Sequence, residues 1–175
     1  MKKLRAESAA MTVLLAVLVS MGPLSTDMYL PSLPWIARDL NASEAQTQLT
    51  LSVFLIGFAG GQIIYGPISD RFGRKPVLLT GFCLFILATA LCAMTWSIEL
   101  LIAARFCQAI GACAAVVIAR AIVRDLFAAE RAARIMSFMG ALMGAVPAVA
   151  PVLGGILQAT FGWRSSFMVV VIIGI

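Results

Sequence analysis

Long runs of apolar residues, separated by short polar connections, dominate the chain. They cover roughly residues 9–34, 47–67, 77–97, 99–125 and 134–161, and a sixth run begins at Trp163 and reaches Ile175. A helix needs about 20 apolar residues to cross the roughly 30 Å hydrocarbon core of a bilayer. The first five runs are long enough and residues 163–175 are too few. The pattern therefore predicts an all-α membrane protein with five spanning helices and a sixth helix that is cut off.

Composition supports a bilayer as the solvent. Hydrophobic residues make up 62% of the chain and charged residues 12%, whereas soluble domains have about 45–50% and about 25%. The basic start, Met1 to Arg5, followed by an apolar run, could also be a secretory signal, but no A-x-A-like cleavage site follows. We therefore expect residues 9–34 to be the first spanning helix.

The positive charges predict an orientation. If the amino terminus is cytoplasmic and every span reverses direction, ten Lys and Arg residues lie inside, Arg38 and Arg164 lie outside, and Arg105 lies within the membrane. This positive-inside bias is typical of a multi-pass protein of a bacterial-type inner (plasma) membrane, and it explains the net charge of +5 better than nucleic-acid binding does. The inner cations are Lys2, Lys3, Arg5, Arg71, Arg74, Lys75, Arg120, Arg124, Arg131 and Arg134. Tryptophans favour membrane boundaries, and the three in this chain fall at the outer ends of spans: Trp35, Trp96 and Trp163.

Two charged residues lie inside apolar runs and away from the membrane boundaries, Asp27 in the first run and Arg105 in the fourth. At a rise of about 1.5 Å per residue, each lies roughly 10 Å below the outer boundary, so we expect them to meet in a central cavity. Three interpretations remain open. The two residues form a static pair that fixes helix packing, or Asp27 is interfacial because nearby prolines loosen the helix. Alternatively, Asp27 loads and releases a proton as its solvation and its contact with Arg105 change.

Polar and small residues form a stripe on the second and fourth predicted helices. Such stripes either hold helices together or line a cavity, and we take Gln48, Gln62 and Gln108 as cavity candidates. The second helix carries Gln48, Ser52, Leu55, Ala59, Gln62 and Gly66, and the fourth carries Arg105, Gln108, Ala112, Ala115 and Ala119.

Metal and cofactor chemistry has little support in the sequence. The chain contains no His, and its four cysteines lie in apolar runs without a CxxC pair. There is no Walker loop, so ATP is not the expected energy source in this chain. We expect no metal, no cofactor and no enzymatic activity.

The connection between the second and third predicted helices carries a recognisable motif. Residues 66–76 resemble the loop signature of the major facilitator superfamily, G-x-x-x-D-R-x-G-R-[RK], at every defined position, with Gly66, Asp70, Arg71, Gly73 and Arg74. We expect Gly66 to permit close helix packing and Gly73 a sharp turn. Asp125, at the inner end of the fourth helix, is a candidate partner for one of the loop's basic residues.

Three further motifs point to the same superfamily. Arg105, Gln108 and Gly111 resemble its fourth-helix motif R-x-x-Q-G-x-G, and residues 25–31 together with 161–164 resemble the drug:proton antiporter branch of the bicyclomycin/chloramphenicol-resistance type. The fifth helix is similar to the antiporter motif G-x-x-x-G-P-x-x-G-G, a proposed hinge or seal. Its residues here are Gly144, Pro147, Pro151, Gly154 and Gly155.

The resemblance implies the amino-terminal half of a twelve-helix transporter with a three-plus-three inverted repeat. It implies proton-coupled efflux of small amphipathic compounds by alternating access, driven by the proton gradient, with Asp27 and Arg105 at the proton or substrate site and the loop motif as a gate. The expected partners are the substrate, protons, the bilayer and the carboxy-terminal six-helix half, which the chain lacks. Uptake of a metabolite or siderophore, and a truncated or assembly protein that does not transport, remain alternatives.

Overall fold

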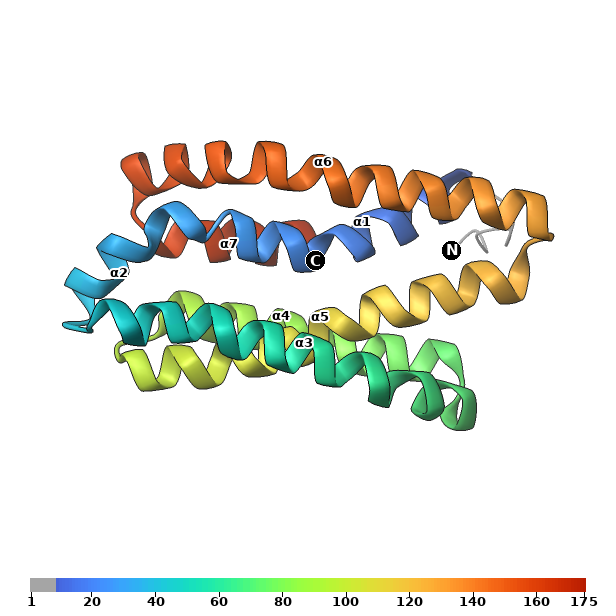
Figure 1. Cartoon of the computed structure of the whole chain (residues 1–175), viewed down its shortest axis with the longest axis horizontal. Helices are drawn as coiled ribbons and strands as arrows, with labels where there is room; N and C mark the ends of the chain where they lie inside the picture. The colour runs from blue at the N-terminus through green and yellow to red at the C-terminus, as the bar shows by residue number, and fades with distance from the viewer. Residues whose placement is uncertain (1–8) are drawn as a thin grey trace.

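The computed structural model describes residues 9–175, which are almost wholly helical (Figure 1). The elements are α1 (Ala9–Asp27), the 3-10 helix η1 (Leu30–Ser32), α2 (Leu33–Asp39), α3 (Glu44–Phe72), α4 (Arg74–Met94), α5 (Ile98–Leu126), α6 (Ala129–Phe161) and α7 (Arg164–Gly174). Five segments are long and apolar enough to cross a membrane, and the first of them, Ala10–Asp39, includes α1, η1 and α2. The predicted all-α class is confirmed.

The first predicted helix differs from the expectation of one continuous span over residues 9–34. α1 ends at Asp27, the chain turns through η1, and α2 continues to Asp39. Pro31 and Pro34 lie within the residues that follow α1, and a proline removes a backbone donor and clashes with the preceding helical turn. The break therefore lies where the proline-rich sequence cannot extend a regular helix.

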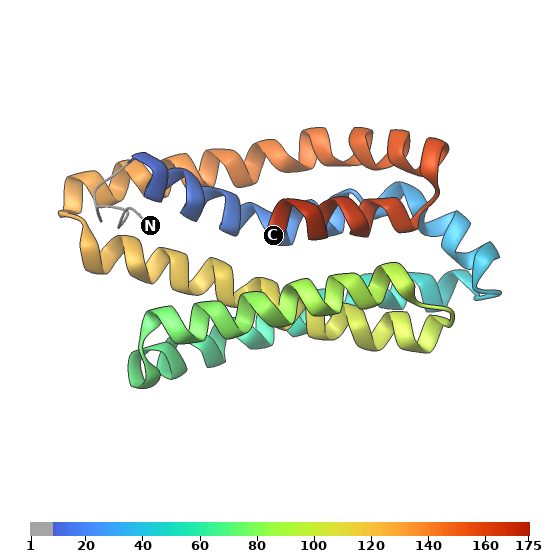
Figure 2. The same ribbon diagram turned by 180° about the vertical axis from the view of Figure 1, so that it is seen from behind.

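The helices lie side by side along the long axis, and their connections alternate between the two ends (Figures 1 and 2). The α3–α4 and α5–α6 turns share one end, which we call the basic end because they and the adjoining helix ends carry Arg71, Arg74, Lys75, Arg120, Arg124, Arg131 and Arg134. The other end, the tryptophan end, holds α2 and the α4–α5 and α6–α7 turns, with Trp35, Trp96 and Trp163. The predicted Lys2, Lys3 and Arg5 lie outside the described residues.

Local sequence signals fix the helix boundaries. Ser43 and Gln46 form a capping box at the start of α3, in which the Ser43 hydroxyl accepts from the backbone N–H of Gln46 at 3.2 Å. Gly73, between α3 and α4, has φ +91, a backbone region that favours glycine. The sharp turn predicted at Gly73 is thus confirmed.

Helix α5 is the centre of the packing, since it contacts α3, α4, α1 and α6. Glycines allow this close approach: a Cβ at Gly111 would lie only 2.5 Å from the backbone nitrogen of Phe85 on α4. The predicted stripe on α5, from Arg105 to Ala119, is buried along its length. The corresponding stripe on α3 is largely exposed and points away from the rest of the bundle.

Candidate functional site

Arg105 is the largest fully buried side chain of the described residues and lies in an aromatic cage. Its guanidinium carbon is 4.4 Å from the ring centre of Phe54 on α3, 4.7 Å from that of Tyr29 beside η1, and 5.9 Å from that of Phe167 on α7. Rings within about 6 Å attract a cation through their quadrupoles. Four separate segments therefore meet around this one charge.

A chain of hydrogen bonds anchors Arg105. Its Nη1 donates to the Ser25 carbonyl oxygen at 3.2 Å and to Gln108 Oε1 at 2.7 Å. Gln108 in turn donates from Nε2 to the Thr89 hydroxyl on α4 at 2.9 Å. The Nε and Nη2 atoms of Arg105 are buried and have no hydrogen-bond partner among residues 9–175. Burying a charge without a full set of hydrogen bonds costs roughly several kcal/mol of desolvation free energy. An anionic or polar group placed beside Nε and Nη2 would therefore be stabilised.

The predicted meeting of Asp27 and Arg105 is wrong in this structure. No ion pair joins them in the part of the chain that the structure describes. Asp27 is the last residue of α1 and is half-buried, whereas Met28 and Tyr29 are fully buried. Successive helical residues point about 100° apart, and the break after Asp27 turns the Tyr29 ring over the guanidinium instead. Asp27 is thus near the site along the chain without contacting its cation.

Only one of the three predicted cavity glutamines joins this site. Gln108 is fully buried and bonded to Arg105. Gln48 and Gln62 are exposed on α3, and neither contacts Arg105. The helical spacing predicted one face correctly, but that face of α3 lies on the outside of the described bundle.

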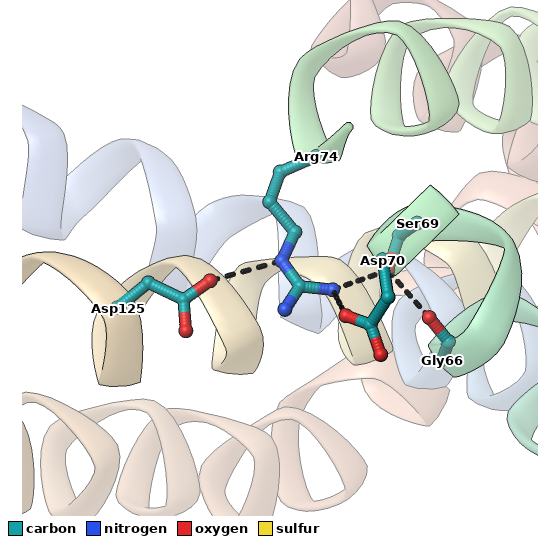
Figure 3. A network of polar contacts seen from close by, with 5 residues as sticks. All are labelled: Gly66, Ser69, Asp70, Arg74 and Asp125. Atoms are coloured by element: carbon teal, nitrogen blue, oxygen red, sulfur yellow. Dashed lines mark hydrogen bonds and ion pairs between the residues drawn. The ribbon is translucent and has the colours of Figure 1, made fainter. Parts of the chain in front are cut away.

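The basic loop forms a second polar centre, shown in Figure 3. Arg74 pairs with Asp70 within the same turn, donates from Nε to Asp125 Oδ2 at 2.9 Å, and donates from Nη1 to the Ser69 hydroxyl at 2.6 Å. The predicted contact between Asp125 and the loop is therefore confirmed, with Arg74 as the partner. This network ties the α3–α4 turn to the end of α5.

Two other members of the loop motif behave differently. Arg71 is exposed, and its guanidinium carbon lies 5.4 Å from the ring centre of its neighbour Phe72. Among residues 9–175 the expected close packing at Gly66 is not found, because a Cβ there would meet none of their atoms within 4 Å. Gly66 contributes its carbonyl oxygen, which accepts from the Ser69 hydroxyl at 3.0 Å. The residue supports the network through its backbone.

The antiporter-type motif on α6 is divided between two environments. Gly154 is buried, and a Cβ there would lie 2.8 Å from the Met28 Cα and closer still to the Met28 carbonyl oxygen. Gly144 and Pro147 are exposed, Pro151 and Gly155 are half-buried, and a Cβ at Gly144 or Gly155 would meet nothing. α6 remains helical through both prolines. Within the motif, Gly154 is thus the glycine at which α6 closely approaches the break in the first helix.

An apolar groove of about 410 Å³ lies between α3 and α5. Glycines line part of it, and Gly60 is the member whose Cβ would meet nothing within 4 Å. Apolar pockets of this size accept the hydrophobic part of a small molecule. Its lining residues are Ile56, Gly57, Gly60, Gly61, Ile64, Tyr65, Ile68, Phe106 and Ile110.

Comparison with known proteins agrees with this architecture. The family model described as Major Facilitator Superfamily matches residues 14–175. The chain belongs to the Major Facilitator Superfamily. It is 44% identical over 170 residues to the "Uncharacterized MFS-type transporter YdgK" of Bacillus subtilis. The matched region covers 96% of this chain and 42% of that protein. It is 42% identical over 158 residues to the "Multidrug resistance protein MdtL" of Escherichia coli O81 and of Shigella dysenteriae, covering 90% of this chain and 40% of each relative.

The superfamily match and the apolar helices show a multi-pass membrane protein. The all-helical structure with five candidate spans is what the amino-terminal part of a Major Facilitator Superfamily fold would have. The chain spans about two fifths of the length of the curated relatives it matches.

Sequence reasoning missed most partners of Arg105 in this superfamily member. Tyr29 lies within residues 25–31, whose resemblance to the antiporter branch predicts no contact with Arg105; its hydroxyl lies 2.7 Å from that of Thr50 on α3. Thr89 was not singled out, although a hydroxyl within an apolar run is a recognisable signal. Phe54 and Phe167 carry no sequence signal, because a phenylalanine in an apolar run does not reveal whether it faces lipid, another helix or a cation.

Proposed function

We propose that this chain forms the amino-terminal half of a proton-coupled exporter of small amphipathic compounds that works by alternating access. The observation that supports it best is the fully buried Arg105 beside the break that follows Asp27, with Nε and Nη2 atoms that have no hydrogen-bond partner in the described part of the chain. A charge kept inside a membrane protein at this cost marks a substrate or ion pathway. Two of the relatives are multidrug resistance proteins by name, which favours drugs as the substrate class.

In this mechanism Asp27 is the proton-carrying group and Arg105 its modulator. Asp27 is half-buried at the end of α1, where water can reach it in one state of the transporter. In the present conformation the Tyr29 ring covers Arg105 and no ion pair forms. A second conformation that brings the carboxylate to the two free guanidinium donors would release its proton, because a nearby cation favours the ionised form. A membrane potential of about 100 mV contributes about 2.3 kcal/mol for each charge moved.

The remaining parts follow the same proposal. The apolar groove between α3 and α5 would take the hydrophobic body of the substrate. Gln48 and Gln62 lie on another, exposed face of α3 and would offer polar contacts in the cavity that the carboxy-terminal half completes. The Asp70–Arg74–Asp125 network would act as a gate at the basic end, and the α6 motif as a hinge. We place the protein in a bacterial-type inner membrane with the basic end cytoplasmic. The carboxy-terminal half would complete the cavity.

The test is an Asp27→Asn substitution in a complete transporter that contains this chain. In inside-out vesicles energised by a proton gradient, we expect drug uptake to fall to background, because the amide cannot carry the coupling proton. Glu99→Gln is the matched control, since it removes one exposed carboxylate at the start of α5. Gradient-driven uptake that survives Asp27→Asn at the wild-type rate would refute the assignment.

A further inference from the structure

A compact polar cluster closes the tryptophan end of the bundle. Asp39 Oδ2 accepts from Trp163 Nε1 at 2.9 Å and from Arg164 Nη1 at 2.7 Å. Arg164 also donates from Nη2 to the Thr95 carbonyl oxygen at 3.0 Å, and its guanidinium carbon lies 4.2 Å from the centre of the Trp163 ring. We call Asp39, Trp163 and Arg164 the outer clamp.

The outer clamp joins three segments that are distant in the sequence. Asp39 ends α2, and Thr95 lies in the α4–α5 connection. Trp163 lies in the α6–α7 turn and Arg164 begins α7. Gly162, with φ +81, allows the chain to reverse directly before Trp163. The three connections lie together at the same end of the molecule (Figures 1 and 2). One carboxylate, one indole and one guanidinium therefore tie them to one another.

The segment that Asp39 ends needs such a tie. α2 has seven residues and follows the break after α1. A helix this short is unstable by itself and takes its position from tertiary contacts. Contact between Asp39 and the α6–α7 turn fixes the far end of α2, so it also restricts how far η1 and Tyr29 can move.

Aromatic contacts connect the outer clamp to Arg105. The Trp163 ring is 6.2 Å from Phe167 in an edge-on arrangement, and Phe167 is 5.4 Å from Tyr29. Both Phe167 and Tyr29 belong to the cage around the Arg105 guanidinium. Trp163 is itself only 5% exposed. We call this indole the lid: its Nε1 donates to Asp39, and its ring contacts Phe167 of the cage.

We propose that Asp39, Trp163 and Arg164 are positioning residues, which hold the broken first helix closed over Arg105 and exclude water and solutes from the guanidinium at the tryptophan end. Asp39 and Arg164 remain partly accessible, with side chains 46% and 38% exposed, so the clamp can open without unfolding the bundle. This role goes beyond proton coupling, because it holds whether or not Asp27 carries a proton.

Cys92 offers a direct probe of the clamp. It is fully buried in the same apolar cluster as Trp163, Phe167 and Tyr29. Cys113 is equally buried, but it lies on α5 against Gly61 of α3. A chain that keeps only Cys92 reports opening beneath the clamp, and a chain that keeps only Cys113 reports general loosening. Cys83 and Cys107 are exposed, and both are replaced by Ser in each version.

The experiment measures the rate at which N-ethylmaleimide labels each single-cysteine chain in lipid vesicles. We expect Asp39→Asn and Arg164→Gln each to speed Cys92 labelling at least about fivefold, since each removes a charge-assisted bond that holds the lid. Cys113 labelling stays unchanged. The exchanged pair Asp39→Arg with Arg164→Asp restores part of the protection of Cys92.

Glu130→Gln is the matched control, because it breaks an Arg–carboxylate pair with Arg134 at the basic end, where the two atoms are 2.6 Å apart. It leaves Cys92 labelling at the parent rate. An unchanged Cys92 rate in both clamp variants would overturn the proposal. A parallel rise at Cys92 and Cys113 would also overturn it, since the clamp would then be an ordinary stabilising contact. Neither result bears on Asp27.

Discussion

The close approach of α6 to the broken first helix gives two neighbouring glycines opposite expected responses to the same substitution. Gly154 faces the Met28 backbone, whereas a Cβ at Gly155 would meet nothing within 4 Å. Gly154→Ala therefore adds a methyl group where two backbones touch, and Gly155→Ala adds one in open space. The pair forms an internal control, because both positions lie on the same helical turn.

The magnitude follows from the geometry. The Cβ at position 154 would lie 2.8 Å from the Met28 Cα, and ordinary van der Waals contact begins at 3.4 Å, so α6 and the break must separate by at least 0.6 Å (3.4 − 2.8). Backbone cannot rotate away as a flexible side chain can, and overpacking of this kind costs about 1–3 kcal/mol. Gly155→Ala meets no such obstacle and gains helix propensity, which stabilises by up to about 1 kcal/mol.

The assay is reversible unfolding of the purified chain in detergent micelles by added sodium dodecyl sulfate. Tryptophan fluorescence reports the transition, because Trp163 is buried in the folded chain, in one apolar cluster with Tyr29, the neighbour of Met28. We expect Gly154→Ala to lower the free energy of unfolding and Gly155→Ala to leave it unchanged or raise it. Equal shifts of the same sign in the two variants would refute the close approach of α6 to Met28.

Three further expectations can be checked independently. Arg105→Lys keeps the charge but loses the planar contact with the rings and the two hydrogen bonds from Nη1. The free energy of unfolding in the same assay falls by about 1–3 kcal/mol. An unchanged midpoint would contradict the aromatic cage. Arg74→Ala lowers the free energy of unfolding by at most about 1 kcal/mol, because the network is partly exposed. Adding Asp125→Asn to that variant lowers it little further. Losses that simply add would contradict the pairing of Arg74 with Asp125. A Cβ at Gly60 would meet nothing within 4 Å among the described residues, so Gly60→Leu directs its side chain into the α3–α5 groove. Drug efflux by a complete transporter is expected to fall while its expression does not. Gly140→Leu on α6 is the control, because Gly140 lies outside the groove and a Cβ there would also meet nothing within 4 Å. Equal efflux in the last two variants would exclude the groove as the drug site.

The spanning helices and the ends of the bundle at which their connections lie could be predicted from the sequence. Apolar length predicted the spanning helices, because the thickness of a bilayer limits how short such a helix can be. The sorting of cations and tryptophans between alternate connections predicted which turns share an end. The loop pattern also predicted that Asp125 meets a basic residue, because both lie at the same end of neighbouring helices.

Only the tertiary structure decided what surrounds Arg105. Depth along the membrane placed Asp27 and Arg105 at one level, but the break after Asp27 changes the direction in which each following side chain points. Tyr29 therefore covers the guanidinium, and Asp27 does not pair with it. Likewise, the sequence pattern does not distinguish Gly154 from Gly155 or from Gly66, because close approach depends on which side of a helix meets its neighbour. The sequence determined which segments are long and apolar enough to cross the membrane, and in what order. Packing determined which atoms meet, because the rotation and the separation of two helices depend on all the side chains at their interface.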